Sequence, residues 1–256
     1  MALIRNATQF SRTATRSLNH WFESPAGQRL RVAERDALAF EFRRLFSPLI
    51  VQVGGPDPWI EASPAAHKIW VVADPVNDVQ VPQVSGWPAQ LPLAGNTADA
   101  LVLAHALDTT RHPQAVLREA VRVLRPGGTL LVVGFDPTGW IGLTRALGLR
   151  GPRALWLRKQ RLVDWLTLLD CRVERLSTLG HSPRLSALTH WNLPGGSFYL
   201  MRVKKERIVP PSALRQRLRG RLLSLGGARG QVQLGRSVTG HSVSRRSIGA
   251  LKGRDP

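Results

Sequence analysis

The sequence is short of several residue types, and each shortage excludes a class of structure. Its 256 residues include one cysteine, Cys171, so an internal disulfide is impossible and a thiolate metal cluster is not expected. So little cysteine suits a reducing compartment and predicts a cytoplasmic protein. No apolar run approaches the ~20 residues that a helix needs to span a bilayer. The histidines lack the local spacing of a metal site, so no metal is predicted.

Acidic residues are also scarce, with 17 Asp and Glu against 36 Lys and Arg, which gives a net charge of +19. The surplus is uneven, because residues 204–256 hold 13 of the basic residues and only two acids. Such a tail is either a solubilising, nonspecifically sticky segment or a contact for nucleic acid or an anionic membrane. No motif that reads RNA or DNA accompanies it. We expect one basic helix over 212–225 and disorder elsewhere in the tail.

The clearest local pattern in the chain is a strand, a helix and a second strand. An apolar run at 100–104 predicts a buried strand, 113–125 predicts an amphipathic helix, and 129–133 predicts a second buried strand after a Pro-Gly-Gly turn. A unit of this length is a right-handed crossover between parallel strands. Ligands of open parallel sheets bind outside the carboxyl ends of the strands, which here are His105 and Gly134.

The rest of the chain fits the same α/β architecture. A helix is predicted from Leu30 to Phe46, with Leu38, Phe42 and Phe46 on one inward stripe. The remaining predicted elements are strands at 49–53, 69–72, 80–84, 171–179 and 197–203, and helices at 61–67 and 155–169. Together they predict a doubly wound, Rossmann-like, seven-stranded, mostly parallel sheet. The predicted parts are an N-terminal helical extension (1–47), this domain (48–203) and the basic tail (204–256).

Two stretches carry a family resemblance, LPLAGNTADALVLAHAL and HPQAVLREAVRVLRPGGTLLV. They resemble the centre of class I S-adenosylmethionine-dependent methyltransferases. Residues 21–38, 134–143 and 161–174 resemble a group of uncharacterised bacterial methyltransferase-like proteins. The resemblance covers about residues 20–203 and implies an antiparallel last strand, S-adenosyl-L-methionine as the cofactor and an unidentified methyl acceptor.

The resemblance assigns the turn after the first strand to the cofactor. Gly54 matches the first glycine of the family motif, and with Gly55 it would let the ligand approach the backbone. The second and third motif glycines fall on Pro56 and Pro58, and Pro56 cannot donate a hydrogen bond. The usual acid falls on Gln52, which can still bond an ammonium without charge. Alternatively, Gly54 and Gly55 form only a tight turn.

The resemblance assigns three further residues to the nucleoside. Asp74 ends the second strand, where an acid accepts hydrogen bonds from ribose hydroxyls; the alternative is an exposed loop aspartate. Trp87 and Pro88 fall where related proteins hold adenine. Trp87 either stacks on the base or fills an empty cleft.

Two residues are candidates for catalysis. His105 directly follows the central strand, where it could contact the cofactor and orient the acceptor or take a proton. The alternative is a ring that only fills space. Asp136 follows the next strand and is expected to face the acceptor.

Three functions remain open on the sequence. The first is a class I methyltransferase acting on an unidentified acceptor. The second is a binding or regulatory protein that kept the fold and lost turnover, which the two prolines and Gln52 would suit. The third is a nucleic-acid-associated protein. The first 22 residues, with three arginines and no acid, resemble either a mitochondrial transit peptide or a basic leading helix, and the bacterial resemblance favours the helix.

Overall fold

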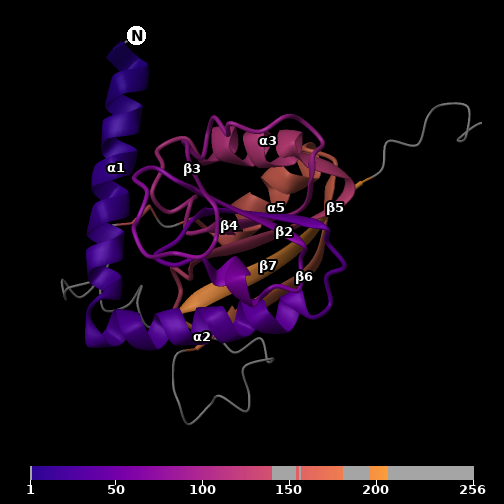
Figure 1. The fold of residues 1–256 in the computed structure, drawn as a ribbon. Coiled ribbons are helices and arrows are strands. Elements are labelled where there is room, and N and C mark those ends of the chain that lie inside the picture. The colour runs from indigo at the N-terminus through magenta and orange to yellow at the C-terminus, as the bar shows by residue number, and fades with distance from the viewer. Residues whose placement is uncertain (1, 140–153, 156, 181–195, 207–256) are drawn as a thin grey trace, which may run out of the picture. The chain divides into compact units, whose positions relative to one another are not determined.

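The computed structural model of the chain describes residues 2–139, 154–155, 157–180 and 196–206. Strands β1 to β7 form one sheet, in the order β3-β2-β1-β4-β5-β7-β6 (Figure 1). The strands are β1 Leu49–Gly54, β2 His67–Val72, β3 Gln83–Ser85, β4 Ala98–Ala104, β5 Leu124–Phe135, β6 Cys171–Leu179 and β7 Phe198–Lys205. The helices are α1 Ala2–Phe22, α2 Pro25–Phe42, the short 3-10 helix η1 Trp59–Ala62, α3 Pro113–Val123 and α5 Lys159–Leu168.

The topology confirms the predicted fold class. The pairs β3-β2, β2-β1, β1-β4 and β4-β5 are parallel, whereas β7 is antiparallel to both of its neighbours, β5 and β6. The last strand therefore inserts inside the sheet, and β6 forms the edge. The central strand β4 is buried along its whole length, as an apolar strand covered on both faces must be.

Helices cover the two faces of the sheet separately (Figure 1). On one face, α3 and α5 bury Val116, Ala120 and Leu162 against the strands. On the other face, α2 and the end of α1 bury Leu38 and Phe22 in a second cluster. Side chains from the end of α1 and from α2, which the sequence places in an N-terminal extension, therefore contribute to the hydrophobic core.

The junction of α1 and α2 shows why the two helices meet closely. The Ser24 side chain caps α2 by accepting a hydrogen bond from the Gly27 N–H at 3.1 Å, and Pro25 takes the first helical position. A Cβ on Gly27 would lie 2.3 Å from the Trp21 carbonyl oxygen. Only glycine fits at this approach, so α2 is held against the end of α1.

Several element boundaries differ from the predictions. Helix α2 ends at Phe42, so Phe46 is 95% exposed instead of facing inward. In place of the helix predicted over 61–67, the structure has only the short 3-10 helix η1. No longer helix fits there, because β2 already begins at His67. Strand β7 runs to Lys205, two residues beyond the predicted end of the domain.

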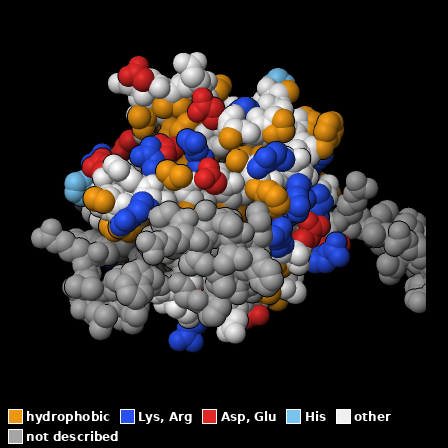
Figure 2. Space-filling view, turned by 90° about the horizontal axis from the view of Figure 1, so that it is seen from below, with side chains coloured by type: hydrophobic (Ala, Val, Ile, Leu, Met, Phe, Trp, Pro, Cys, Tyr) orange, Lys and Arg blue, Asp and Glu red, His pale blue; other side chains and the backbone are white. Residues whose placement is uncertain are grey.

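The visible part of the α2 side of the molecule carries Lys and Arg side chains interspersed with acidic ones, not one basic patch (Figure 2). Arg202 and Arg175 reach Glu41 of α2 at 3.1 and 3.5 Å. Cations of β6 and β7 are thus partly matched by Glu41 of α2. Among the described helices, none is both long and apolar enough to cross a membrane.

The two phenylalanines of the predicted stripe make a matched pair for a stability test. Phe42 is fully buried, so Phe42→Ala should lower the free energy of unfolding by about 3–5 kcal/mol. Phe46→Ala removes the same atoms from an exposed site and should change it by less than about 0.5 kcal/mol. Urea unfolding followed by circular dichroism measures both. Equal losses would contradict the end of α2 at Phe42.

Candidate functional site

A cavity of about 490 Å³ lies at the carboxyl ends of β1, β2 and β4. Five of the predicted site residues line it: Gly54, Gly55, Asp74, Pro88 and His105. Residues of α1 form another part of the lining. The structure thus brings together side chains and turns from three strand ends, as the topology of an open sheet requires.

The turn after β1 needs both of its glycines. Gly54 has φ +74° and Gly55 has φ +86°, values that residues with a side chain rarely adopt. A Cβ on Gly54 would lie 2.9 Å from the carbonyl oxygen of Ala104, and one on Gly55 would lie 2.9 Å from the Ala104 Cβ. The turn therefore rests directly on the end of β4 and keeps backbone, not side chain, at the cavity.

Gln52 does not take the predicted role of binding an ammonium. Its side chain is fully buried, and its Nε2 donates to the Gly54 carbonyl at 2.9 Å and to the Asp57 carbonyl at 2.5 Å. Its Oε1 accepts from the Ile60 N–H at 3.2 Å. With both amide protons used inside the turn, Gln52 shapes the turn and does not line the cavity. A neutral amide can do this in a buried place where a carboxylate could not donate.

Asp74 faces α1. Its carboxylate lies 3.1 Å from Arg16 Nη2 and 3.8 Å from Arg12 Nε. Arg12 also lies over the indole of Trp87, 5.0 Å from the ring centroid. Asp74 is thus an acid with partners, not an unpaired loop residue. Sequence reasoning missed both arginines because it placed them in a separate extension.

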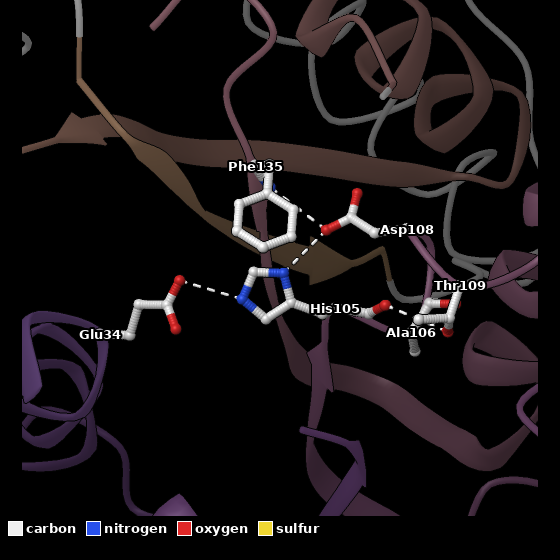
Figure 3. Close-up of polar contacts among 6 residues, drawn as sticks. All are labelled: Glu34, His105, Ala106, Asp108, Thr109 and Phe135. Carbon is white, nitrogen blue, oxygen red and sulfur yellow. Dashed lines mark hydrogen bonds and ion pairs between the residues drawn. The ribbon is translucent and has the colours of Figure 1, made fainter. Parts of the chain in front are cut away.

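His105 is held between two carboxylates (Figure 3). Its Nδ1 lies 2.8 Å from Asp108 Oδ2, and its Nε2 lies 2.9 Å from Glu34 Oε1 on α2. All three side chains are fully buried. Asp108 Oδ2 also accepts from the Phe135 N–H at 3.2 Å. The cluster Glu34–His105–Asp108 therefore ties α2 to the ends of β4 and β5.

The backbone of His105 is unusual as well. Its φ is +53°, a left-handed conformation that costs a residue with a side chain about 1–3 kcal/mol. The two side-chain hydrogen bonds and a backbone bond from the His105 N–H to the Val133 carbonyl at 3.0 Å hold it there. This turn lets the chain leave β4 directly beneath the cavity.

The pKa values of the cluster are all raised. Burial acts to lower the pKa of His105, but the charge of Glu34 and the hydrogen bonds to both carboxylates outweigh it and raise the pKa to about 10. Burial raises the pKa of Glu34 and of Asp108, and the imidazole offsets this only in part. The raised pKa favours a protonated ring, both ring nitrogens contact carboxylates, and the side chain exposes no surface, an arrangement that does not favour proton transfer from an acceptor.

Asp136 is buried too and is fully engaged. Its Oδ2 lies 2.8 Å from Lys159 Nζ at the start of α5, and its Oδ1 accepts from the Thr138 N–H at 3.0 Å and the Thr138 hydroxyl at 2.7 Å. It does not line the cavity. In this arrangement Asp136 fixes the turn after β5, and its position facing an acceptor stays a prediction.

Comparison with known proteins identifies the family. A family model described as "Methyltransferase domain" matches residues 55–132. The uncharacterized protein YafS of Escherichia coli (strain K12) is 30% identical over 184 residues, which cover 69% of this chain and 71% of YafS. The chain belongs to the class I S-adenosylmethionine-dependent methyltransferases. The acceptor of this methyltransferase is not identified by these relatives.

Two further similarities carry less information about function. A demethylmenaquinone methyltransferase of Mycobacterium tuberculosis (strain ATCC 25618 / H37Rv) is 43% identical over 57 residues, 22% of this methyltransferase and 24% of that protein. A crystal structure of a SAM-dependent methyltransferase from Thermotoga maritima has a TM-score of 0.51 at 20% identity, covering 69% of this chain and 91% of that one. At this identity the structural likeness shows the fold alone.

The raised pKa values predict a stability that falls with pH. The folded cluster holds its protons to higher pH than the unfolded chain, and stability falls with pH wherever the folded state binds more protons. The contribution of His105 is complete below its unfolded pKa of about 6.5 and is lost as the pH rises through about 10. Urea unfolding between pH 6 and 10.5 measures it.

Two variants check the cause of this dependence. Glu34→Gln removes the charge that does most to raise the His105 pKa, so the fall between pH 6.5 and 10 should shrink. His67→Gln changes an exposed histidine and should leave the profile unaltered. A parent-like profile in Glu34→Gln would show that the two side chains do not interact.

Proposed function

We propose that the cavity binds S-adenosyl-L-methionine. The ligand lies against the backbone of the glycine turn after β1. Asp74 accepts hydrogen bonds from the ribose hydroxyls, and Trp87 and Pro88 border the adenine. The observation that carries the proposal is the meeting of Gly54, Gly55 and Asp74 in one cavity of about 490 Å³. That volume falls within the roughly 300–1,000 Å³ of small-molecule sites.

S-adenosyl-L-methionine supplies a methyl group already activated by a positively charged sulfur. What the chain must do is hold donor and acceptor in line and exclude water. A base is needed only for an acceptor that must lose a proton. We assign His105 to holding the floor of the cavity and Asp136 to fixing the turn beside it, and neither to proton transfer.

Asp74 should carry much of the recognition, because Gln52 is committed to the turn and Pro56 has no N–H to donate. A charge-assisted hydrogen bond contributes roughly 1.5–3 kcal/mol. Asp74→Ala should therefore weaken cofactor binding about ten- to a hundredfold, and Asp74→Asn should weaken it less. Asp164→Ala removes an exposed acid from α5 and should bind like the parent. Calorimetric titration with S-adenosylmethionine and S-adenosylhomocysteine gives the dissociation constants.

The same titration separates the open functions. Parent-like binding by Asp74→Ala would remove the ribose assignment alone. A parent that binds neither ligand at millimolar concentration would favour a protein that kept the fold without the cofactor. Gly54→Val is not a clean test of ligand contact, because its side chain would strike the Ala104 carbonyl and strain the turn.

We propose that the tail adds nonspecific electrostatic affinity for nucleic acid and takes no part in cofactor binding. Residues 207–256 lie outside the described residues, so the helix over 212–225 and the disorder stay predictions. These residues carry eleven Lys and Arg against one acid. A deletion should start at 207, because Lys204 and Lys205 belong to β7.

Deleting residues 207–256 should leave cofactor affinity unchanged and flatten the salt dependence of any nucleic-acid binding, since fewer phosphates are neutralised. Binding of a fluorescent duplex at several salt concentrations measures the slope. An unaltered slope, or loss of cofactor binding, would count against the proposal.

We also propose that the protein works in the cytoplasm. The support is its lone cysteine, a buried free thiol whose pKa burial raises to about 11. Such a thiol is a structural one that needs no oxidising compartment. Fractionation of cells that express the full chain would locate it.

A further inference from the structure

We propose that α1 is one wall of the cofactor cavity and that Arg12 and Arg16 are nucleoside-positioning residues. The inference rests on the proposed function and extends the site to α1, whose last lining residue, Asn19, precedes Gly54 by 35 residues. On this inference the basic helix α1 contributes to ligand binding.

The first support is the lining itself. Arg12, Thr15, Arg16 and Asn19 of α1 line the cavity together with the glycine turn and Asp74. Residues three and four apart share one face of a helix, so these four form a single polar stripe turned to the cavity. The same helix buries Ala14 and Phe22 in the core, and Leu18 is both buried and part of the lining, so α1 joins the core to the site.

The second support is that α1 is anchored. Phe22 is fully buried, and its ring lies 5.4 Å from the His105 ring. Trp21 meets Phe135 edge-on, with centroids 5.6 Å apart. The end of α1 is thus packed onto the residues that floor the cavity, and the arginines two to three turns earlier are placed by that packing.

The third support shows that α1 lines the cavity and does not fill it. The cavity of about 490 Å³ is present with α1 docked, so the helix leaves the space open. Asp74 also keeps capacity to bind. Arg16 takes one acceptor position on its Oδ2, and Arg12 stays 3.8 Å from its Oδ1, beyond hydrogen-bond distance. A carboxylate has about four acceptor positions, which leaves room for a ribose diol.

Each arginine then has a definite task. Arg16 fixes the orientation of the Asp74 carboxylate. Arg12 lies over the Trp87 indole, beside Gly86 and Pro88 of the lining, and so holds that ring in place. Both side chains are at least half exposed, and ion pairs of this kind contribute little to folding. Their removal should therefore leave the protein folded.

The test is calorimetric titration of the full chain with S-adenosylhomocysteine and with 5′-methylthioadenosine, which shares its nucleoside half. Arg12→Ala and Arg16→Ala should each weaken both ligands about three- to fivefold, and the double variant about tenfold. Arg29→Ala removes an exposed arginine from α2 and should bind within about twofold of the parent. Circular dichroism confirms folding.

Unchanged or tighter binding by the double variant would overturn the inference, because a helix that only blocks the cavity gives that result. A loss confined to S-adenosylhomocysteine would also overturn it, because it would place the arginines at the amino-acid half. If the parent binds and Asp74→Ala is weakened while the arginine variants are not, this inference fails alone. If the parent protein binds neither ligand, the proposed cofactor binding is wrong, and the inference that rests on it falls with it.

Discussion

The His105 ring lies between the carboxylates of Glu34 and Asp108 in a place without exposed surface, and the geometry of the site depends on it. Removing one partner of a buried charged group leaves the other uncompensated and typically costs about 3–5 kcal/mol. Among the described residues, Glu34 Oε2 and Asp108 Oδ1 have no hydrogen-bond partner, and burial raises the pKa of both carboxyls. The cluster thus joins one covering helix to two strand ends.

The N-terminal helices contact the site at several points besides the Glu34–His105–Asp108 cluster. Arg31 of α2 pairs with Asp57 in the loop after the glycine turn, while Glu34 holds His105 below it. Arg16 of α1 reaches Asp74 at the end of β2, which also lines the cavity. The residues that precede β1 therefore set the shape of the site, although the family model matches only residues 55–132.

Local sequence patterns predicted the elements whose formation depends mainly on neighbouring residues. Apolar runs gave the central strands, and their carboxyl ends located Gly54, Asp74 and His105 at one cavity. The prediction that Phe46 continues the inward stripe of the helix is wrong. The helix already ends at Phe42, because the chain must turn before β1 begins at Leu49.

Long-range partners escaped prediction for a different reason. Glu34 and His105 are 71 residues apart and Arg16 and Asp74 are 58 apart, and no local signal in a single sequence pairs such residues. The motif position of Gln52 predicts a contact with the ligand. Its burial and its three hydrogen bonds inside the turn became visible only in the folded chain.

We propose that the cavity between α1 and the strand ends holds the cofactor, and a crystal structure of the full chain with S-adenosylhomocysteine would show whether it does. We expect ribose hydroxyls within hydrogen-bond distance of Asp74, adenine beside Trp87 and Pro88, and α1 still docked with Arg16 on Asp74. A ligand bound elsewhere, or a ligand in this cavity with α1 displaced, would contradict it.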